Sequence, residues 1–325
     1  MAGLKEVAAA SGVSIRTVMR ALSGQGYIDS QTRERVVTQA QRLGYRPNLA
    51  ARSLKTARSF DISVVAWSMD ELHIAKIAGL EQTLRHAGYA VNVLLESAAN
   101  TGGDWLENVL LHRPAGVALF SSSQFHNEQA LRLLDSKLPY IVFDAPTGPL
   151  DSVRIDRQQG VYEAVLYLAA KGRRAIAYLG TQADRSRLDG YLRALGQLSR
   201  RPIYIEQEEG DQYAAGIAAS QRFSELPKAK RPDAVLAYAD EVGLGFMAGL
   251  HERGIRIPSD VAVIGFDDRR AAALSWPRLT TVAQPSRELG IAAAEILLRK
   301  IKGEVEPSTG WSRTMPTKLV LRESA

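Results

Sequence analysis

The sequence has 325 residues, with 41 Lys and Arg against 35 Asp and Glu, and it contains no Cys. The lack of Cys excludes a disulfide framework, a thiolate metal site and a cysteine nucleophile. At roughly 100 to 200 residues per domain, this length predicts two or three domains. The N-terminus has no apolar run of signal-peptide length, and no stretch of about 18 apolar residues occurs. We therefore expect a cytoplasmic protein without a membrane partner.

The positive charge is concentrated at the N-terminus. Residues 1–60 hold ten Lys and Arg against three Asp and Glu, whereas the rest of the chain holds 31 against 32. A compact basic module favours a polyanion as partner, because each neutralised phosphate releases condensed counterions. On charge alone, a solvated basic tail is the alternative.

The basic segment is patterned as three short helices. Apolar residues recur at helical spacing up to Leu22, and Gly12 supplies the permissive backbone for a turn between the first two helices. Ser14 stands at the expected N-cap of the second helix, where its side chain can accept from backbone N–H groups. A third helix is expected from about residue 30 to Leu43. The pattern predicts a folded head and not a disordered tail.

After Ser59, apolar strand-like runs alternate with longer amphipathic stretches. The expected strands are 62–67, 90–95, 116–120, 140–143, 175–179, 203–205, 234–238 and 261–265. Such alternation predicts parallel sheets with helices on both faces. The strands at 62–67 and 175–179 are each followed by a similar Gly-containing helix, so we expect two related lobes. A ligand cleft would lie between them, at the carboxyl ends of the strands.

Several segments carry a family resemblance through their order and spacing. In the head they are VSIRTVMRAL, TRERV, LGYRPN and AARSLKT; in the body they are AGLEQTLRHAGY, GRRAIAYLG, SRLDGY, GIRIPSDVAVIGFDD, PRLTTVAQP and LGIAAAEILLRKIKG. Together they resemble the lactose/galactose-repressor (LacI) family of bacterial transcription regulators over the whole chain. The resemblance implies an α/β fold class: a small all-α helix-turn-helix head and a two-lobed body like the periplasmic binding proteins, built of doubly wound parallel sheets.

The resemblance also implies the domain organisation. A DNA-binding head would occupy 1–59, with a hinge helix at about 48–56, and an effector-binding and dimerisation body would occupy 60–325. Within the body, lobe 1 would cover about 60–157 and 286–315, and lobe 2 about 158–285 and 316–325.

The second helix of the head corresponds to the family's recognition helix. Arg16 and Arg20 are the candidates for direct base readout, because the guanidinium fork matches the O6 and N7 acceptors of guanine. Ser14 and Thr17 suit phosphate contacts, which fix the register on DNA. With Ile15, these residues form the expected DNA-binding set of the helix. Without the helix-turn-helix context, solvated helix residues would be the simpler interpretation.

The segment from Asn48 to Lys55 resembles the family's hinge helix, which orders when two copies meet over the minor groove. Asn48 would begin this helix, and Lys55 would lie along the groove wall. Leu54 would be a wedge that unstacks a base step at a cost of about a few kcal/mol, while the resulting bend exposes further contacts. An ordinary packing leucine in a linker is the alternative for Leu54.

The resemblance carries the effector contacts onto Asp144, Arg187, Asp267 and Gln284. Carboxylates and a planar Arg fork suit neighbouring sugar hydroxyls, which need acceptors and donors in alternation. Each of these residues, taken singly, is also compatible with a capping or salt-bridge role. Trp67 could supply an apolar stacking face, with core packing as the alternative.

Two departures from the family pattern predict a retuned pocket. Ala239 stands where the family usually has Asn, so a common hydroxyl contact is missing. The segment EEGDQYAAG is one residue short, which leaves Gln212 or Tyr213 in place of the usual aromatic residue.

Enzymatic function is not expected from this sequence. It has no P-loop, G-x-S-x-G or H-E-x-x-H pattern, and its five His residues are dispersed without metal-ligand spacing. We therefore expect no catalytic residues, no metal and no cofactor. A sugar-modifying enzyme would need a catalytic constellation that is missing here, and a sugar-binding transport component would need a signal peptide and no basic head.

The resemblance implies a ligand-responsive, sequence-specific repressor of carbohydrate-metabolism genes, released by a sugar effector. A co-repressor-dependent regulator that senses a nucleobase or another metabolite is the alternative. The implied partners are a pseudo-palindromic double-stranded DNA operator, a small-molecule effector and a second copy of the chain in a homodimer. We see no leucine heptad at the C-terminus that would make a tetramer.

Overall fold

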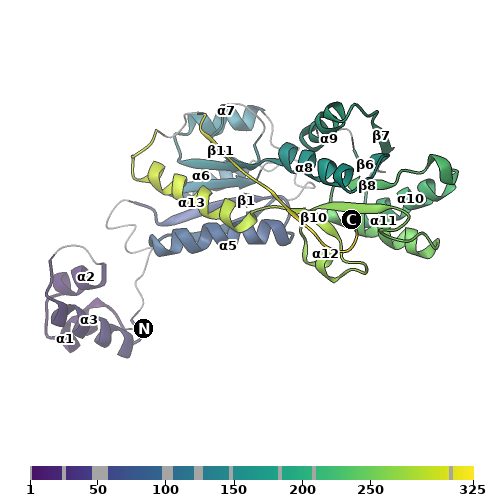
Figure 1. Cartoon of the computed structure of the whole chain (residues 1–325). Coiled ribbons are helices and arrows are strands. Elements are labelled where there is room, and N and C mark those ends of the chain that lie inside the picture. Colours follow the sequence, from purple (N-terminus) through teal and green to yellow (C-terminus); the bar gives the residue numbers. More distant parts are fainter. Residues whose placement is uncertain are drawn as a thin grey trace. The chain divides into compact units, whose positions relative to one another are not determined.

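The computed structural model describes residues 2–23, 27–45, 58–96, 105–120, 127–145, 149–181, 185–206, 210–306 and 310–325. The chain divides into two compact units, residues 1–60 and residues 61–325 (Figure 1). The hinge candidates Asn48, Leu54 and Lys55 lie outside the described residues. Within those residues, no helix combines the length and the apolar character that crossing a bilayer requires.

The described part of the N-terminal unit is a bundle of three helices. They are α1 (Leu4–Ser11), α2 (Ile15–Ser23) and α3 (Ser30–Arg42). Gly12 closes α1 with a φ of 64°, and the Ser14 hydroxyl accepts from the Thr17 N–H at 3.1 Å, so both predicted turn residues have the expected conformations. Asp29, one residue before the predicted start, caps α3 through the Thr32 N–H. The core consists of Val7, Ala8, Val18, Ala21, Val36 and Ala40.

The C-terminal unit contains two six-stranded sheets, one in each lobe. Lobe 1 has the strand order β11-β5-β4-β3-β1-β2, and lobe 2 has the order β12-β10-β9-β8-β6-β7. The strands of lobe 1 are β1 (Asp61–Ala66), β2 (Ala90–Leu95), β3 (Gly116–Phe120), β4 (Tyr140–Phe143), β5 (Ser152–Ile155) and β11 (Ser312–Met315). Those of lobe 2 are β6 (Ile176–Gly180), β7 (Ile203–Glu206), β8 (Ala234–Ala237), β9 (Ala262–Asp267), β10 (Thr280–Ala283) and β12 (Lys318–Val320).

Helices cover both faces of each sheet. The helices of lobe 1 are α5 (Glu71–His86), α6 (Trp105–His112), α7 (Asn127–Asp135) and α13 (Ser286–Ile301). Those of lobe 2 are α8 (Arg157–Ala170), α9 (Arg185–Gln197), α10 (Gln212–Glu225), the short 3-10 helix η1 (Lys228–Lys230), α11 (Asp240–Glu252) and α12 (Arg270–Leu274). In β1, Ile62 and Val64 pack in one core cluster with α5 and α13, whereas Val65 packs in another with α6 and α7. This alternation is why both faces of the sheet are apolar.

The chain passes between the lobes three times. It crosses after β5 into α8, after β10 into α13, and between β11 and β12. All strand pairs are parallel except β10 with β12, which run antiparallel at the edge of the lobe 2 sheet. Asp144 and Asp267, at the carboxyl ends of β4 and β9, are therefore placed beside these crossings.

The predicted fold class is confirmed: a helical head and two doubly wound sheets. All eight predicted strands are present within two residues of the expected bounds. The prediction missed β5, β10, β11 and β12, which are only three or four residues long. Their apolar runs are too short to separate from loops, and all four flank the crossings, where tertiary pairing and not local pattern defines the strand.

Gly290 provides a stability prediction, because it lies where α13 and α5 approach most closely. A Cβ on Gly290 would meet the Lys76 carbonyl oxygen at 1.9 Å, and one on Gly79 would meet the Arg287 carbonyl oxygen at 2.1 Å. Since backbone atoms cannot move aside cheaply, Gly290→Ala is expected to lower the free energy of unfolding by about 1–3 kcal/mol. Urea unfolding checks this. The control is Gly196→Ala in α9, where a Cβ meets nothing within 4 Å and the helix preference for Ala predicts no loss. Equal effects of both changes would contradict the close approach.

Candidate functional site

The head presents a polar face along α2. Arg16 and Arg20 are exposed, Ile15 is 39% exposed, and Val18 on the opposite side is fully buried. The hydroxyls of Ser14 and Thr17 are 2.9 Å apart at the start of the helix. The packing of α2 on α1 and α3 thus leaves the predicted base-reading residues on the outside, as groove binding requires.

In the body, three of the predicted effector residues come together in lobe 2. Arg187 belongs to the first turn of α9, Asp267 ends β9, and Gln284 follows β10. The Gln284 amide donates to Asp267 Oδ1, and Arg187 NH2 lies 3.7 Å from the same oxygen. The Arg187 guanidinium also lies 4.4 Å from the centre of the Phe266 ring. Aromatic stacking fixes the planar donor next to the carboxylate.

Asp267 is almost fully buried, and its pKa is raised. Desolvation is the largest cause, and the charges of Arg187 and Arg269 and the Gln284 hydrogen bond act in the opposite direction. A carboxyl held this way between donors can accept from ligand hydroxyls as well as from its protein neighbours.

A cavity of about 290 Å³ lies beside Asp267 and Gln284. Its walls come from the first turns of α5 and α13 and from the ends of β9 and β10, through Glu71, Leu72, Ala75, Asp267, Asp268, Gln284, Ser286, Arg287 and Glu288. Gln284 Oε1 and Ser286 Oγ are buried without a hydrogen-bond partner. Buried polar atoms are normally satisfied, so these two atoms offer contacts to a polar ligand.

Asp144 lies in lobe 1, where it is held by two cations. Its carboxylate accepts from Lys76 Nζ at 3.1 Å and from Arg157 NH1 at 2.9 Å. Burial opposes ionisation, but the charges and hydrogen bonds of Arg157 and Lys76 prevail and hold the pKa of Asp144 well below its usual range. The charge of Arg157 also acts on Asp267. Asp144 is thus connected electrostatically to the lobe 2 cluster through Arg157.

Trp67 is placed apart from these polar groups. It packs against the lobe 1 core, edge-on to Trp105 with 6.4 Å between ring centres. It does not line the described cavity. Its geometry matches core packing, which was the alternative interpretation.

The structure shows where the residues that depart from the family pattern lie. Gln212 donates to the Tyr238 hydroxyl at 2.9 Å, beside Arg187, whereas Tyr213 is 45% exposed. Gln212 Oε1 is buried without a partner. Ala239 serves as the N-cap position of α11, with no side-chain cap. Of the two residues that the sequence left open at this position, Gln212 is therefore the one that lies beside Arg187.

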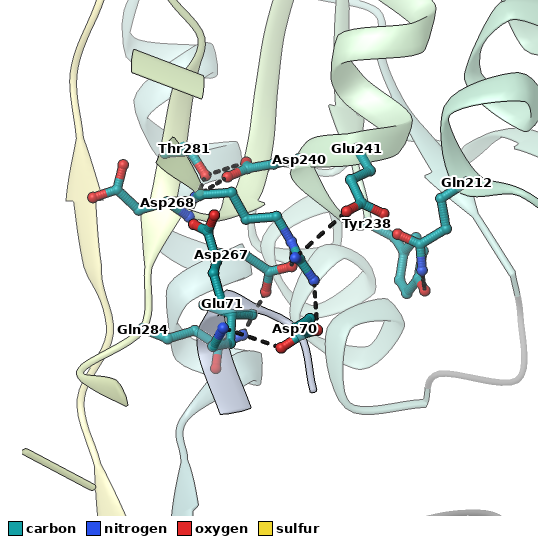
Figure 2. Close-up of polar contacts among 12 residues, drawn as sticks. Asp70, Glu71, Gln212, Tyr238, Asp240, Glu241, Asp267, Asp268, Thr281 and Gln284 are labelled. Carbon is teal, nitrogen blue, oxygen red and sulfur yellow. Dashed lines mark hydrogen bonds and ion pairs between the residues drawn. The ribbon is translucent and has the colours of Figure 1, made fainter. Parts of the chain in front are cut away.

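Sequence reasoning missed a polar network that joins the two lobes. Asp70 and Glu71 of lobe 1 face Asp240, Glu241 and Asp267 of lobe 2 (Figure 2). Arg269 NH2 donates to Asp70 at 2.9 Å, and the Arg270 N–H donates to Glu71 at 2.7 Å. The signal available in the sequence was the DDRR run directly after β9.

Asp240 is a strongly perturbed carboxyl of this network. It is completely buried at the start of α11, where it accepts from the Thr281 hydroxyl at 2.5 Å and from the Arg269 N–H at 2.7 Å (Figure 2). The pKa of Asp240 is raised to about 8, mainly by desolvation and further by the charges of Asp267 and Asp268, although the hydrogen bonds from Thr281 and Arg269 act in the opposite direction. Asp240 is thus protonated at neutral pH.

No group of three or more His, Cys, Asp or Glu residues in the described ranges is arranged to hold a metal ion. The candidate site consists of hydrogen-bonding side chains and a cavity. Such a site suits binding of a polar small molecule.

Comparisons with known proteins agree with this division into head and body. Residues 3–48 match the model for bacterial regulatory proteins of the lacI family, and residues 165–325 match the periplasmic binding protein-like domain. The chain is 30% identical over 317 residues to catabolite control protein A of Priestia megaterium, covering 94% of each chain. It is 31% identical over 319 residues to the HTH-type transcriptional repressor PurR of Vibrio atlanticus, covering 93% of this chain and 92% of the relative.

Solved structures resemble the chain over nearly its full length. The lac repressor dimer bound to operator and the anti-inducer ONPF aligns with a TM-score of 0.80 at 25% identity, covering 99% of this chain and 98% of that chain. The complex of the transcriptional regulator CelR with cellobiose aligns with a TM-score of 0.71 at 27% identity, covering all of both chains.

A helix-turn-helix head and a two-lobed body with a polar cavity define a ligand-responsive, DNA-binding transcription regulator. The chain belongs to the lacI family of bacterial regulatory proteins. This confirms the resemblance drawn from the sequence motifs. It also agrees with the expectation of a regulator and not an enzyme.

Proposed function

We propose that this regulator is a homodimeric repressor of carbohydrate-metabolism genes that a sugar effector releases from its operator. The observation that carries the proposal is the grouping of Arg187 and Gln284 around Asp267, because Asp267 and Gln284 line a cavity of about 290 Å³. Alternating donors and acceptors of this kind suit the hydroxyls of a sugar. The resemblance to CelR in complex with cellobiose supports the same ligand class.

On the DNA side, two copies would place their α2 helices in successive major grooves of a pseudo-palindromic site. Half-sites would then lie about 10 base pairs apart or nearly so. Ser14, Ile15, Arg16, Thr17 and Arg20 would contact DNA from α2, and Asn48, Leu54 and Lys55 would act at the hinge. The resemblance to the operator-bound lac repressor dimer supports this arrangement. Such a protein would work in the cytoplasm.

The response would be a population shift. A sugar that binds one arrangement of the lobes more tightly than another changes the share of operator-competent dimers, and equal affinity for both would change nothing. Asp144, Arg187, Asp267 and Gln284 would hold the sugar. Trp67, just after the end of β1, would support this site from the lobe 1 core, where it packs against Trp105.

Co-repression by a nucleobase is the second candidate function. The specific observation in its favour is the 31% identity to the PurR repressor over nearly the whole chain. The two functions differ in sign, because an inducer lowers operator affinity and a co-repressor raises it.

A thermal-shift screen and a gel-shift titration test the proposal together. Sugars, sugar acids and nucleobases are screened first, since a ligand that binds only the folded protein raises its melting temperature. The hits are then added to the protein on DNA from upstream of its own gene. A sugar that both stabilises the protein and releases the DNA is the expected result. A nucleobase that tightens the complex would replace the first function by the second.

Arg20→Ala is expected to weaken binding to the specific site by about 1–3 kcal/mol and binding to random DNA much less, because a lost base contact removes discrimination. Competition gel shifts measure both affinities. Arg42→Ala, on the exposed side of α3, is the control and should leave the ratio of the two affinities unchanged. Equal losses of Arg20→Ala on both DNAs would assign Arg20 to a phosphate.

A further inference from the structure

The residues that follow β9 in lobe 2 hold the first turn of α5 in lobe 1. Arg269 NH2 donates to Asp70 Oδ2 at 2.9 Å, and the next residue, Arg270, donates its backbone N–H to Glu71 Oε1 at 2.7 Å. Asp70 is the N-cap of α5 and also accepts from the Leu72 and His73 N–H groups. The contacts therefore join elements that are 199 residues apart in the chain.

Arg269 is held in place from its own lobe. Its backbone N–H donates to the buried carboxyl of Asp240, and its NH1 lies 3.4 Å from Glu241 Oε1. The Arg269 side chain is only 14% exposed, and Asp70 is 32% exposed. A charge-assisted hydrogen bond that is shielded in this way is stronger than an ion pair on an open surface.

The same guanidinium also lies next to the candidate effector carboxylate. Arg269 Nε is 3.7 Å from Asp267 Oδ2, which is beyond hydrogen-bond distance, and this nitrogen is buried without an acceptor. Glu71, the partner of Arg270, lines the cavity together with Asp267. The Arg269 side chain thus lies against both the proposed effector carboxylate Asp267 of lobe 2 and Asp70 at the start of α5 in lobe 1.

We propose that Arg269 is a positioning residue that transmits effector occupancy at Asp267 to lobe 1 through Asp70. The inference rests on the proposed function and specifies how its effector site is regulated. A ligand that binds Asp267 changes the surroundings of Arg269 Nε, which lies next to that carboxylate. Because NH2 of the same guanidinium donates to Asp70, the N-cap of α5, the change reaches lobe 1. The Asp70–Arg269 contact joins the two lobes at this point.

Hydrogen exchange on the full-length protein tests the contact without a known ligand. The Arg270 amide reports on the junction directly, because its acceptor lies on the other lobe. Arg269→Met and Asp70→Asn are each expected to speed exchange at Arg270 and in the first turn of α5 by about tenfold or more. Asn can still cap α5, so D70N separates loss of the contact from loss of the helix end. The double variant should exchange no faster than the single variants.

The control is Arg256→Met, which breaks an ion pair with Asp260 that lies wholly within lobe 2. It should leave exchange at the junction unchanged. R269M could speed hydrogen exchange only in the residues next to position 269, while D70N leaves the Arg270 amide protected. In that case Arg269 is a local structural residue and the proposal is wrong.

Operator binding provides the second readout. R269M and D70N should shift the dissociation constant of the ligand-free protein on its upstream DNA by about fivefold or more, in the same direction. The proposed induction predicts tighter binding, and weaker binding in both variants would support the contact while favouring co-repression. If hydrogen exchange shows that the contact between the lobes is lost but the dissociation constant for DNA is unchanged, the proposed coupling between Arg269 and operator binding is wrong. Failure of the wild-type protein to bind this DNA would instead refute the proposed function, and the exchange data would still decide on the contact.

Discussion

The D240N variant should become progressively more stable than the wild-type protein as the pH rises from about 4 to about 8. In the folded protein, burial raises the pKa of Asp240 from 3.8 to about 8. Between these values the unfolded chain has lost the proton while the folded chain still binds it, so wild-type stability falls with pH. Asn carries no proton to lose. The difference in unfolding free energy should therefore grow by up to about 1.4 kcal/mol per pH unit.

Urea unfolding at several pH values between 4 and 9 measures this difference. Asn can replace both contacts of Asp240, because its amide can donate to the Thr281 hydroxyl and its carbonyl can accept from the Arg269 N–H. Asp260→Asn is the control, since hydrogen bonds from Arg256 hold the pKa of that exposed carboxyl at about 2. Above about pH 5 Asp260 is ionised in both the folded and the unfolded state, so its effect should not vary with pH there. A constant difference for D240N would show that Asp240 ionises normally.

Arg187→Ala is expected to abolish the effector response while operator binding survives. The substitution removes the donor fork beside Asp267 and leaves the faces of Phe266 and Tyr238 uncovered. A site built to hydrogen-bond a polar ligand loses affinity strongly when a buried donor is removed. Gel shifts with and without the effector found by the thermal screen measure both functions.

Arg185→Ala is the matched control for this variant. Arg185 begins the same helix, but it is 69% exposed and pairs with Asp189 four residues later. Its removal should leave the response intact. A retained response in R187A would place the effector elsewhere in the body, and loss of operator binding in R187A would show that the change disrupts the fold.

The head and the two-lobed organisation follow from local pattern. The turn at Gly12, the cap at Ser14 and the helical spacing of Val18 each specify local backbone or burial by themselves. Strands of five or more mostly apolar residues in the body, such as 116–120, were also predictable, because a continuous apolar run indicates a buried strand from the local sequence alone. The short strands β11 and β12 became strands only through pairing with β5 and β10, which no local pattern encodes.

The candidate site was predictable in part. The family resemblance indicated Arg187, Asp267 and Gln284, and the structure brings the three together. It also indicated Asp144, but the carboxylate of Asp144 is shared by Lys76, 68 residues earlier, and by Arg157. The Asp70–Arg269 contact depends on how the lobes meet, so the sequence offered only the individual charges.

Competition binding of the purified protein to DNA from upstream of its own gene tests the central claim most directly. A sequence-specific regulator should prefer the native site over a scrambled site of the same composition by roughly a thousandfold or more at physiological salt. Binding to both DNAs should weaken as salt is added, because phosphate contacts release counterions. We expect this preference to be large and to depend on Arg20. Equal affinity for the native and scrambled sites would contradict it.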